Sequence, residues 1–141
     1  RPVSSAASDV YKRQYQKSKL RRIMSGAETK SFDKPDQEFK QFDNADMYHV
    51  NVGGQRLVQI KLQPGWKWSK DVKPKIDSDA ASCQANHIGV IVKGTVCAKH
   101  DDGTEITYTA GSAYSVKPGH DAWVVGDEPV IAYEFGGVWG E

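Results

Sequence analysis

Cys83 and His87 are the two side chains in this sequence whose types and spacing are best suited to chemistry. They stand four residues apart, so in an extended segment both side chains would face the same side. A thiolate and an imidazole are common ligands of zinc and of other transition metals. A structural interpretation stays open for each, because a cysteine is often a small buried residue and a buried histidine often only hydrogen-bonds to the backbone.

The remaining histidines and the second cysteine give weaker signals. His120 and Asp121 follow a Pro-Gly turn, where a histidine either braces the loop or serves as a ligand. His49 and His100 have nothing around them that suggests chemistry, and Cys97 falls in an apolar alternation, so we expect structural roles for these three. Two thiols in a chain of 141 residues do not make a disulfide framework, and both are predicted to be reduced.

Short β-strands must position these residues, because the chain from residue 47 onward alternates apolar and polar residues between turn residues. Residues 48–52 and 56–62, separated by Gly53-Gly54, predict a hairpin. A polar loop is expected over 69–82, and no helix of ordinary length is needed. This pattern predicts an all-β protein, a small antiparallel β-barrel or jelly roll. Its later strands are expected at residues 87–92, 95–99, 105–109, 113–116, 122–125 and 130–135.

Composition describes one ordinary globular domain, with 38% hydrophobic residues, 26% charged residues and a net charge of +1. No apolar run is long enough to cross a bilayer, and no signal-peptide core is present, so we expect a cytoplasmic protein with no membrane partner. Residues 1–23 hold seven basic residues and one acidic residue, so the rest of the chain is acidic, which argues against a nucleic-acid partner. The sequence has no Gly-rich phosphate loop, Gly-x-Ser-x-Gly, Cys-x-x-Cys or His-Glu-x-x-His motif.

The N-terminal stretch 4–14 (SSAASDVYKRQ) resembles, residue for residue, the in-frame translation of a transposon-based sequencing-library adapter. This indicates a gene translated from an environmental, metagenomic assembly. We therefore expect residues 1–23 to be disordered adapter or read-through sequence, with Tyr15–Ile23 left open as a genuine N-terminus, and Met24 to be the natural start.

Two further regions follow this stretch. Residues 24–46 are predicted to be a polar lead-in whose isolated Phe32, Phe39 and Phe42 pack on the body. Residues 47–141 are predicted to form the β-barrel domain.

The glycine and proline spacing of the second half resembles the cupin family. The second cupin motif runs Gly, five residues, Pro, one residue, Gly, two residues, His. Residues 111–122 (GSAYSVKPGHDA) match its glycine frame, with Lys117 at the proline and Ala122 at the histidine position. Gly94 matches the closing glycine of the first motif, which puts His87 at the position of that motif's Glu.

Two longer stretches, 64–74 (PGWKWSKDVKP) and 118–129 (PGHDAWVVGDEP), look like a branch of single-domain cupins with no well-defined activity. The resemblance covers residues 64–135, about half of the chain. It implies the cupin β-barrel, also called a double-stranded β-helix.

In cupins three histidines and a carboxylate inside the barrel hold a divalent iron, manganese, zinc or nickel ion. Only Cys83 and His87 can ligate at the four matching positions, because Ala81 and Ala122 occupy the other two. His120 lies close to the expected histidine, and a shifted loop could supply it as a third ligand. One thiolate and two imidazoles favour zinc, then iron, and the alternative is that no metal is bound.

Aromatic residues suggest a pocket, because cupin mouths commonly bind small ligands between rings. The alternative is that the rings fill the core of a small barrel. Val138 and Trp139 are expected to cover an edge strand or to join a homodimer contact, since cupins often pair through their sheets. The expected pocket residues are Trp66, Trp68, Tyr114, Asp121 and Trp123.

Three functions from different classes fit these observations. The first is a cupin-domain protein that binds a small molecule inside the barrel, with or without a divalent metal. The second is a metal-dependent enzyme such as a dioxygenase, isomerase or decarboxylase, in which an open metal position activates water or oxygen. The third is a structural barrel that dimerises.

Overall fold

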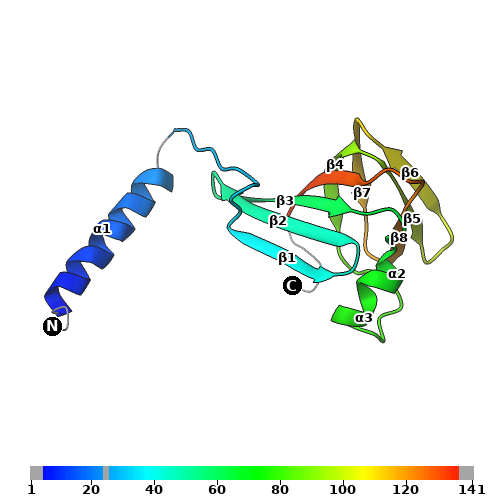
Figure 1. Ribbon diagram of the computed structural model, residues 1–141, viewed down its shortest axis with the longest axis horizontal. Helices are drawn as coiled ribbons and strands as arrows, with labels where there is room; N and C mark the ends of the chain where they lie inside the picture. Colours follow the sequence, from blue (N-terminus) through cyan, green and yellow to red (C-terminus); the bar gives the residue numbers. More distant parts are fainter. Residues whose placement is uncertain (1–4, 24–25, 137–141) are drawn as a thin grey trace.

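Two antiparallel β-sheets form the body of the protein in the computed structural model, which describes residues 5–23 and 26–136 (Figure 1). A six-stranded sheet has the order β1-β2-β3-β9-β4-β7, and a three-stranded sheet has the order β6-β5-β8. This confirms the predicted all-β architecture; Val138 and Trp139 lie outside the described residues. The strands are β1 (Gln37–Phe42), β2 (Ala45–Val52), β3 (Gln55–Leu62), β4 (His87–Lys93), β5 (Thr95–His100), β6 (Glu105–Thr109), β7 (Ser112–Val116), β8 (His120–Val124) and β9 (Val130–Phe135).

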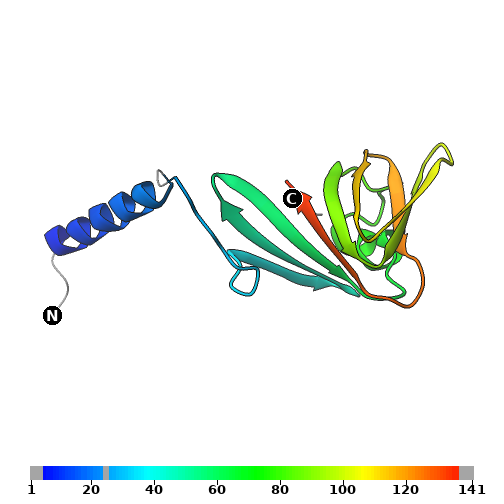
Figure 2. The same ribbon diagram turned by 90° about the horizontal axis from the view of Figure 1, so that it is seen from above.

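Alternating burial along the strands gives both sheets one face in a shared core. In β8 and β9 every second residue is buried, and the second half of β3 follows the same rule. Figure 2 shows strands β4 to β8, green to orange, curled around this interior beside the longer β2 and β3. The core draws on both sheets and includes Val58, Ile60, Leu62, Ile91, Val96, Ala98, Val116, Ala122, Val124, Val130 and Ala132.

The predicted hairpin at Gly53-Gly54 is confirmed. Strands β2 and β3 pair from Ala45↔Leu62 to Val52↔Gln55, which leaves the two glycines as a two-residue turn. Their φ values are 58° and 74°. Two successive residues with positive φ are what a type I′ hairpin turn requires, and glycine adopts them without steric cost.

The loop expected over 69–82 holds short helices, α2 (Trp68–Asp71) and α3 (Lys73–Ile76). Four-residue helices carry no apolar period, so the sequence pattern could not reveal them. Asp71 is buried, and its carboxylate accepts a hydrogen bond from the backbone N–H of Lys67 at 3.0 Å. This contact fixes the chain where it enters α2.

The segment that precedes α2 runs beside β8. Lys67 forms an isolated β-bridge with Trp123, and the N–H of Val124 donates to the carbonyl of Trp66 at 3.0 Å. Trp66 and Trp68 are buried on either side of the exposed Lys67. Both indoles are therefore held on the interior side of the barrel.

The lead-in expected over 24–46 contains all of β1 and the start of β2, so the sheet begins earlier than residue 47. Only Phe42 of β1 is buried, so the strand has no alternation to detect and is held as an edge strand by its pairing with β2. The predicted packing of aromatic residues is present, since the Phe32 ring lies 5.3 Å from that of Tyr133 and the Phe39 ring 4.7 Å from that of His49.

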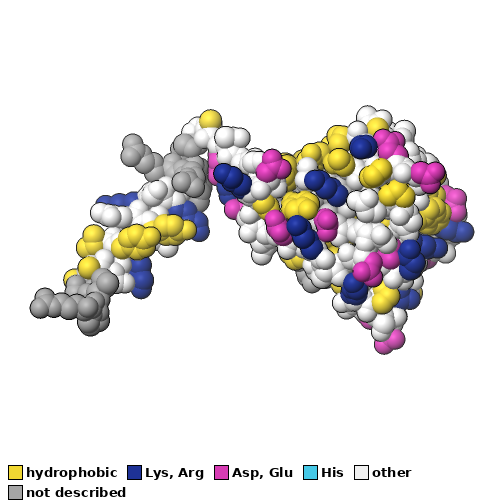
Figure 3. Space-filling view, in the orientation of Figure 1, with side chains coloured by type: hydrophobic (Ala, Val, Ile, Leu, Met, Phe, Trp, Pro, Cys, Tyr) yellow, Lys and Arg dark blue, Asp and Glu magenta, His cyan; other side chains and the backbone are white. Residues whose placement is uncertain are grey.

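Ser5–Ile23 form a helix, α1, where the sequence predicted disorder. The segment contains neither glycine nor proline and is rich in alanine, lysine, arginine and glutamine, which have high or neutral helix propensity. Its apolar Val10, Tyr11 and Tyr15 are exposed, and Figure 3 shows α1 standing apart from the body. Within the described residues, no helix is long and apolar enough to cross a membrane.

Candidate functional site

The site begins where a loop pairs with the first residue of β8. The N–H of Cys83 donates to the carbonyl of His120 at 2.7 Å, and the N–H of Gly119 donates to the carbonyl of Cys83 at 2.8 Å. Gly119 has a φ of 91°, a value that favours glycine, and this turn delivers His120 to the start of β8. His87, the first residue of β4, is four residues after Cys83. Two strands and one loop thus converge at one end of the barrel.

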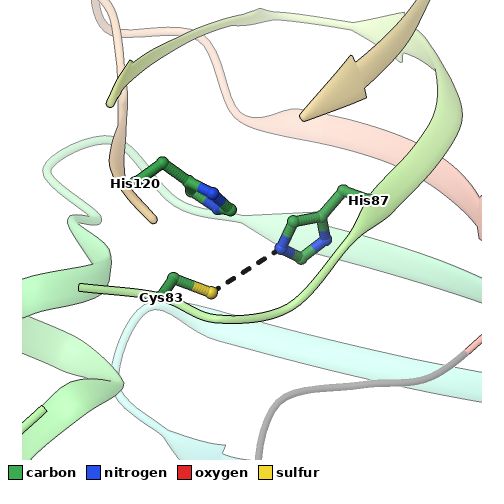
Figure 4. A group of neighbouring side chains, drawn as sticks. All are labelled: Cys83, His87 and His120. Carbon is green, nitrogen blue, oxygen red and sulfur yellow. Dashed lines mark hydrogen bonds between the residues drawn. The ribbon is translucent and has the colours of Figure 1, made fainter. Parts of the chain in front are cut away.

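The structure brings Cys83, His87 and His120 together. One ligand atom from each lies within 4.8 Å of the others, and the Sγ of Cys83 lies 3.8 Å from the Nε2 of His87. The exposed fractions are 3%, 8% and 3%, so all three side chains are buried. Figure 4 shows the three side chains pointing toward one another.

Hydrogen bonds on the far side of each imidazole fix which nitrogen faces the cluster. The Nδ1 of His120 lies 2.6 Å from the carbonyl oxygen of Lys117, which can only accept, so Nδ1 donates and Nε2 carries the lone pair. The Nδ1 of His87 lies 2.8 Å from the Oε2 of Glu134 and donates to that carboxylate. Both rings are therefore oriented from behind, as metal-binding histidines usually are.

Glu134 is a part of the site that the sequence analysis missed. It is buried, and its Oε1 accepts a hydrogen bond from the hydroxyl of Tyr114 at 2.8 Å while its Oε2 holds His87. A signal was present: in β9 the residues Val130, Ala132 and Glu134 occupy alternate positions, so a carboxylate stands where the pattern predicts an apolar residue facing the interior.

The electrostatics favour a thiolate and an imidazolium in the protein without metal. Burial opposes ionisation of Cys83, but its interactions with His120 and then His87 outweigh it and lower the pKa of the thiol to about 7. Burial likewise opposes protonation of His87, but its bonds to Cys83 and Glu134 raise the pKa of this imidazole to about 10. Burial, then the charge of Glu134, raises the pKa of Tyr114, so this phenol stays a donor.

A narrow cavity extends from the cluster into the barrel. His87 and His120 line it together with Glu134, and apolar residues form most of the remaining wall. The centres of water molecules can occupy about 30 Å³ of it, whereas about 10–15 Å³ suffices for one water. The cavity accommodates a ligand of a few atoms.

Three of the five expected pocket residues, Trp66, Trp68 and Tyr114, lie in the wall of this cavity. Asp121 and Trp123 do not, because alternation along β8 turns His120, Ala122 and Val124 inward instead. Asp121 accepts the N–H of Ser69 at 3.1 Å, and Trp123 lies 5.3 Å beneath the ammonium of Lys67. These two residues anchor the segment around α2 from outside.

The residues expected to be structural lie outside the cluster. The Nδ1 of His49 accepts a hydrogen bond from the Nε of Arg56 at 2.8 Å, and His100 contacts the carbonyl of Lys117 at 3.2 Å. Cys97 is buried in β5, and neither cysteine forms a disulfide.

No protein-family model matches the chain, and no curated protein is significantly similar to it in sequence. Its fold, however, is found among solved structures. An RmlC-like cupin from Shewanella frigidimarina is 16% identical, with a TM-score of 0.51, over 80% of this chain and 95% of that one. The chain has the cupin fold. Two proteins of unknown function also share it: one from Vibrio parahaemolyticus (20% identity, TM-score 0.51, 70% and 95% coverage) and a DUF1255 protein from Acidithiobacillus ferrooxidans (13%, 0.52, 73% and 88%).

Within this fold, the donor set fits a metal ion. Ligand atoms around a tetrahedral zinc lie about 3.3–3.6 Å apart, and the Cys83 to His87 distance of 3.8 Å is close to that. The cupin motif positions occupied by Ala81 and Ala122 supply no ligand, so the set consists of Cys83, His87 and His120 and leaves a fourth position open.

Proposed function

We propose that this cupin binds a divalent transition-metal ion, zinc before iron, through Cys83, His87 and His120. The observation that supports this most directly is the burial of three ligand atoms within 4.8 Å of one another at the end of the cavity. A thiolate and two imidazoles form a borderline-soft set that suits zinc, with three protein ligands and one open position, as in catalytic zinc sites.

The residues around the cluster would hold the ligands in place. Glu134 orients His87, and the carbonyl of Lys117 orients His120. To bind zinc, His87 must lose the proton on Nε2. Glu134 holds the other proton on Nδ1, so that Nε2 is free to be the ligand. When bound, the ion would supply a Lewis acid that polarises a small ligand.

The size of the cavity supports a small ligand at the open position. The wall is mostly apolar, and the free space described above admits only a few atoms. We therefore propose that the small molecule predicted from the sequence binds next to the metal, and catalysis at that position stays a prediction.

Elemental analysis of the purified full chain after loading with zinc or iron tests the proposal. We expect about one zinc per chain, and loss of that zinc in Cys83→Ala and in His87→Ala, because each removes a ligand. Cys97→Ala is the matched control: it removes the other buried cysteine and should keep its zinc. Zinc that is absent from the wild type, or retained in Cys83→Ala, would overturn the proposal.

A further inference from the structure

Trp68 lies in the cavity wall and carries a buried hydrogen-bond donor. Its side chain is 2% exposed and lies in the cavity wall with His87 and His120. Its indole Nε1 has no hydrogen-bond acceptor among the described protein atoms. A buried indole N–H ordinarily has a partner, since burying it unpaired is unfavourable.

The backbone places Trp68 beside the strand that begins with His120. The chain from Trp66 to Ser69 is bonded along β8, whose first residue is His120. The contacts that fix the segment, Asp121 to Ser69 and Asp71 to Lys67, both lie outside the cavity. The position of Trp68 is thus set by the fold and does not depend on a ligand.

The charge balance indicates what the open position would accept. A divalent ion with one thiolate and two neutral imidazoles keeps one positive charge. Glu134 also carries a negative charge, but it lies behind His87 on the Nδ1 side, whereas the metal and its open position lie on the Nε2 side, toward Cys83. A positive centre among apolar walls favours an anion, because charges interact more strongly at low dielectric.

We propose that Trp68 donates its indole N–H to a small monoanion, of the size of azide or formate, held at the open coordination position of the Cys83, His87 and His120 site. The indole acts as a specificity-determining donor, because a ligand binds more tightly when it has a second acceptor atom besides the one that contacts the metal. The cavity limits that ligand to a few heavy atoms. This inference rests on the proposed metal site.

Azide binding to the cobalt(II)-loaded full chain tests it, since the visible absorption of cobalt reports on its ligands. We expect azide to change the spectrum of the wild type. In Trp68→Phe the dissociation constant should rise about tenfold or more, the loss expected for one hydrogen bond to a charged group. Trp123→Phe is the matched control, since it removes an indole N–H outside the cavity, keeps an aromatic ring beneath Lys67, and should leave azide affinity unchanged.

The wild type gives an independent measurement in case Trp68→Phe does not fold. In the zinc-loaded protein, the indole ¹⁵N–¹H resonance of Trp68, assigned through its contacts with the cavity wall, should move downfield when azide is added. It should not move in the metal-free protein. Cobalt that does not bind would overturn both this inference and the proposed function. If cobalt binds, two results would overturn this inference alone. One is an azide affinity that is equal in Trp68→Phe and the wild type, and the other is a Trp68 resonance that does not shift when azide is added.

Discussion

Glu134 decides how His87 is held, although it does not belong to the ligand set. Glu134→Gln removes the charge that fixes the Nδ1 proton of His87 and keeps the size of the side chain. We expect zinc affinity to fall about 10- to 100-fold, the usual cost of losing a partner behind a metal ligand. Competition with a chromophoric chelator measures the affinity.

Tyr114→Phe is the milder companion of this variant, because it removes a single hydrogen bond to Glu134 and leaves the carboxylate on His87. It should lower zinc affinity less. Equal affinity in Glu134→Gln and wild type would show that the carboxylate does not support the site.

At the scale of residues, the resemblance to the first cupin motif placed Cys83 and His87 at ligand positions, and their spacing of four puts both on one side of an extended segment. His120 was reached only through the resemblance to the cupin motif. The isolated β-bridge between Cys83 and His120 is what brings this histidine into the cluster. Glu134 was missed because its partners are 20 and 47 residues away in sequence. Local patterns do not encode such distant pairings.

At the scale of elements, β4 passes β9 closely at Gly89. A Cβ at this position would clash with the carbonyl of Tyr133 and lie 2.9 Å from the Cγ of Glu134 and 3.0 Å from the hydroxyl of Tyr114. Gly89→Ala should lower the free energy of unfolding by about 1–3 kcal/mol, as overpacking does, and weaken zinc binding by displacing Glu134. Urea denaturation and the chelator assay check both, with Gly26→Ala, which meets nothing within 4 Å, as control.

The segment before β1 is fastened to the β2–β3 hairpin by Asp36. Its carboxylate accepts bonds from the ammonium of Lys30 at 2.8 Å and the N–H of Asn51 at 2.7 Å, which hold its pKa below the ordinary 3.8. A carboxyl group whose pKa is lowered in the folded state stabilises that state at pH values above its ordinary pKa. The stabilisation is lost as the pH falls through the folded-state pKa. Protection of the Asn51 amide from hydrogen exchange should therefore be lost only at pH below 3.8.

Amide exchange by NMR, corrected for its intrinsic pH dependence, measures this. In Asp36→Asn the Asn51 amide should be less protected from exchange at neutral pH. Its protection should then show no further loss at low pH, because the variant has no carboxyl group at this position to protonate. Protection in the wild type that persists unchanged well below pH 3.8 would contradict the fastening role.

The strands from β2 to β9 were predictable because burial alternates along β4, β8 and β9 and because glycine turns bound others, including β6, which buries no residue. The elements that were missed lack those signals: β1 buries one residue, and α2 and α3 are one turn long. Disorder was expected for α1 on the origin of its sequence, whereas its residues favour a helix.

At the scale of the whole molecule, a metal that binds only the folded state stabilises it by mass action. Zinc at about 1,000 times its dissociation constant would add about 4 kcal/mol. We expect the melting temperature to rise with zinc concentration in the wild type, to return on chelation, and to stay constant in Cys83→Ala. An equal rise in Cys83→Ala would place the zinc elsewhere.

The predicted homodimer and cytoplasmic location stay predictions.

X-ray absorption at the zinc K-edge of the loaded full chain tests the metal site most directly. The account predicts one sulfur at about 2.3 Å and two imidazole nitrogens at about 2.0–2.1 Å, with one further light ligand. The sulfur should vanish in Cys83→Ala and persist in Cys97→Ala. A first shell of oxygen and nitrogen without sulfur in the wild type would contradict it.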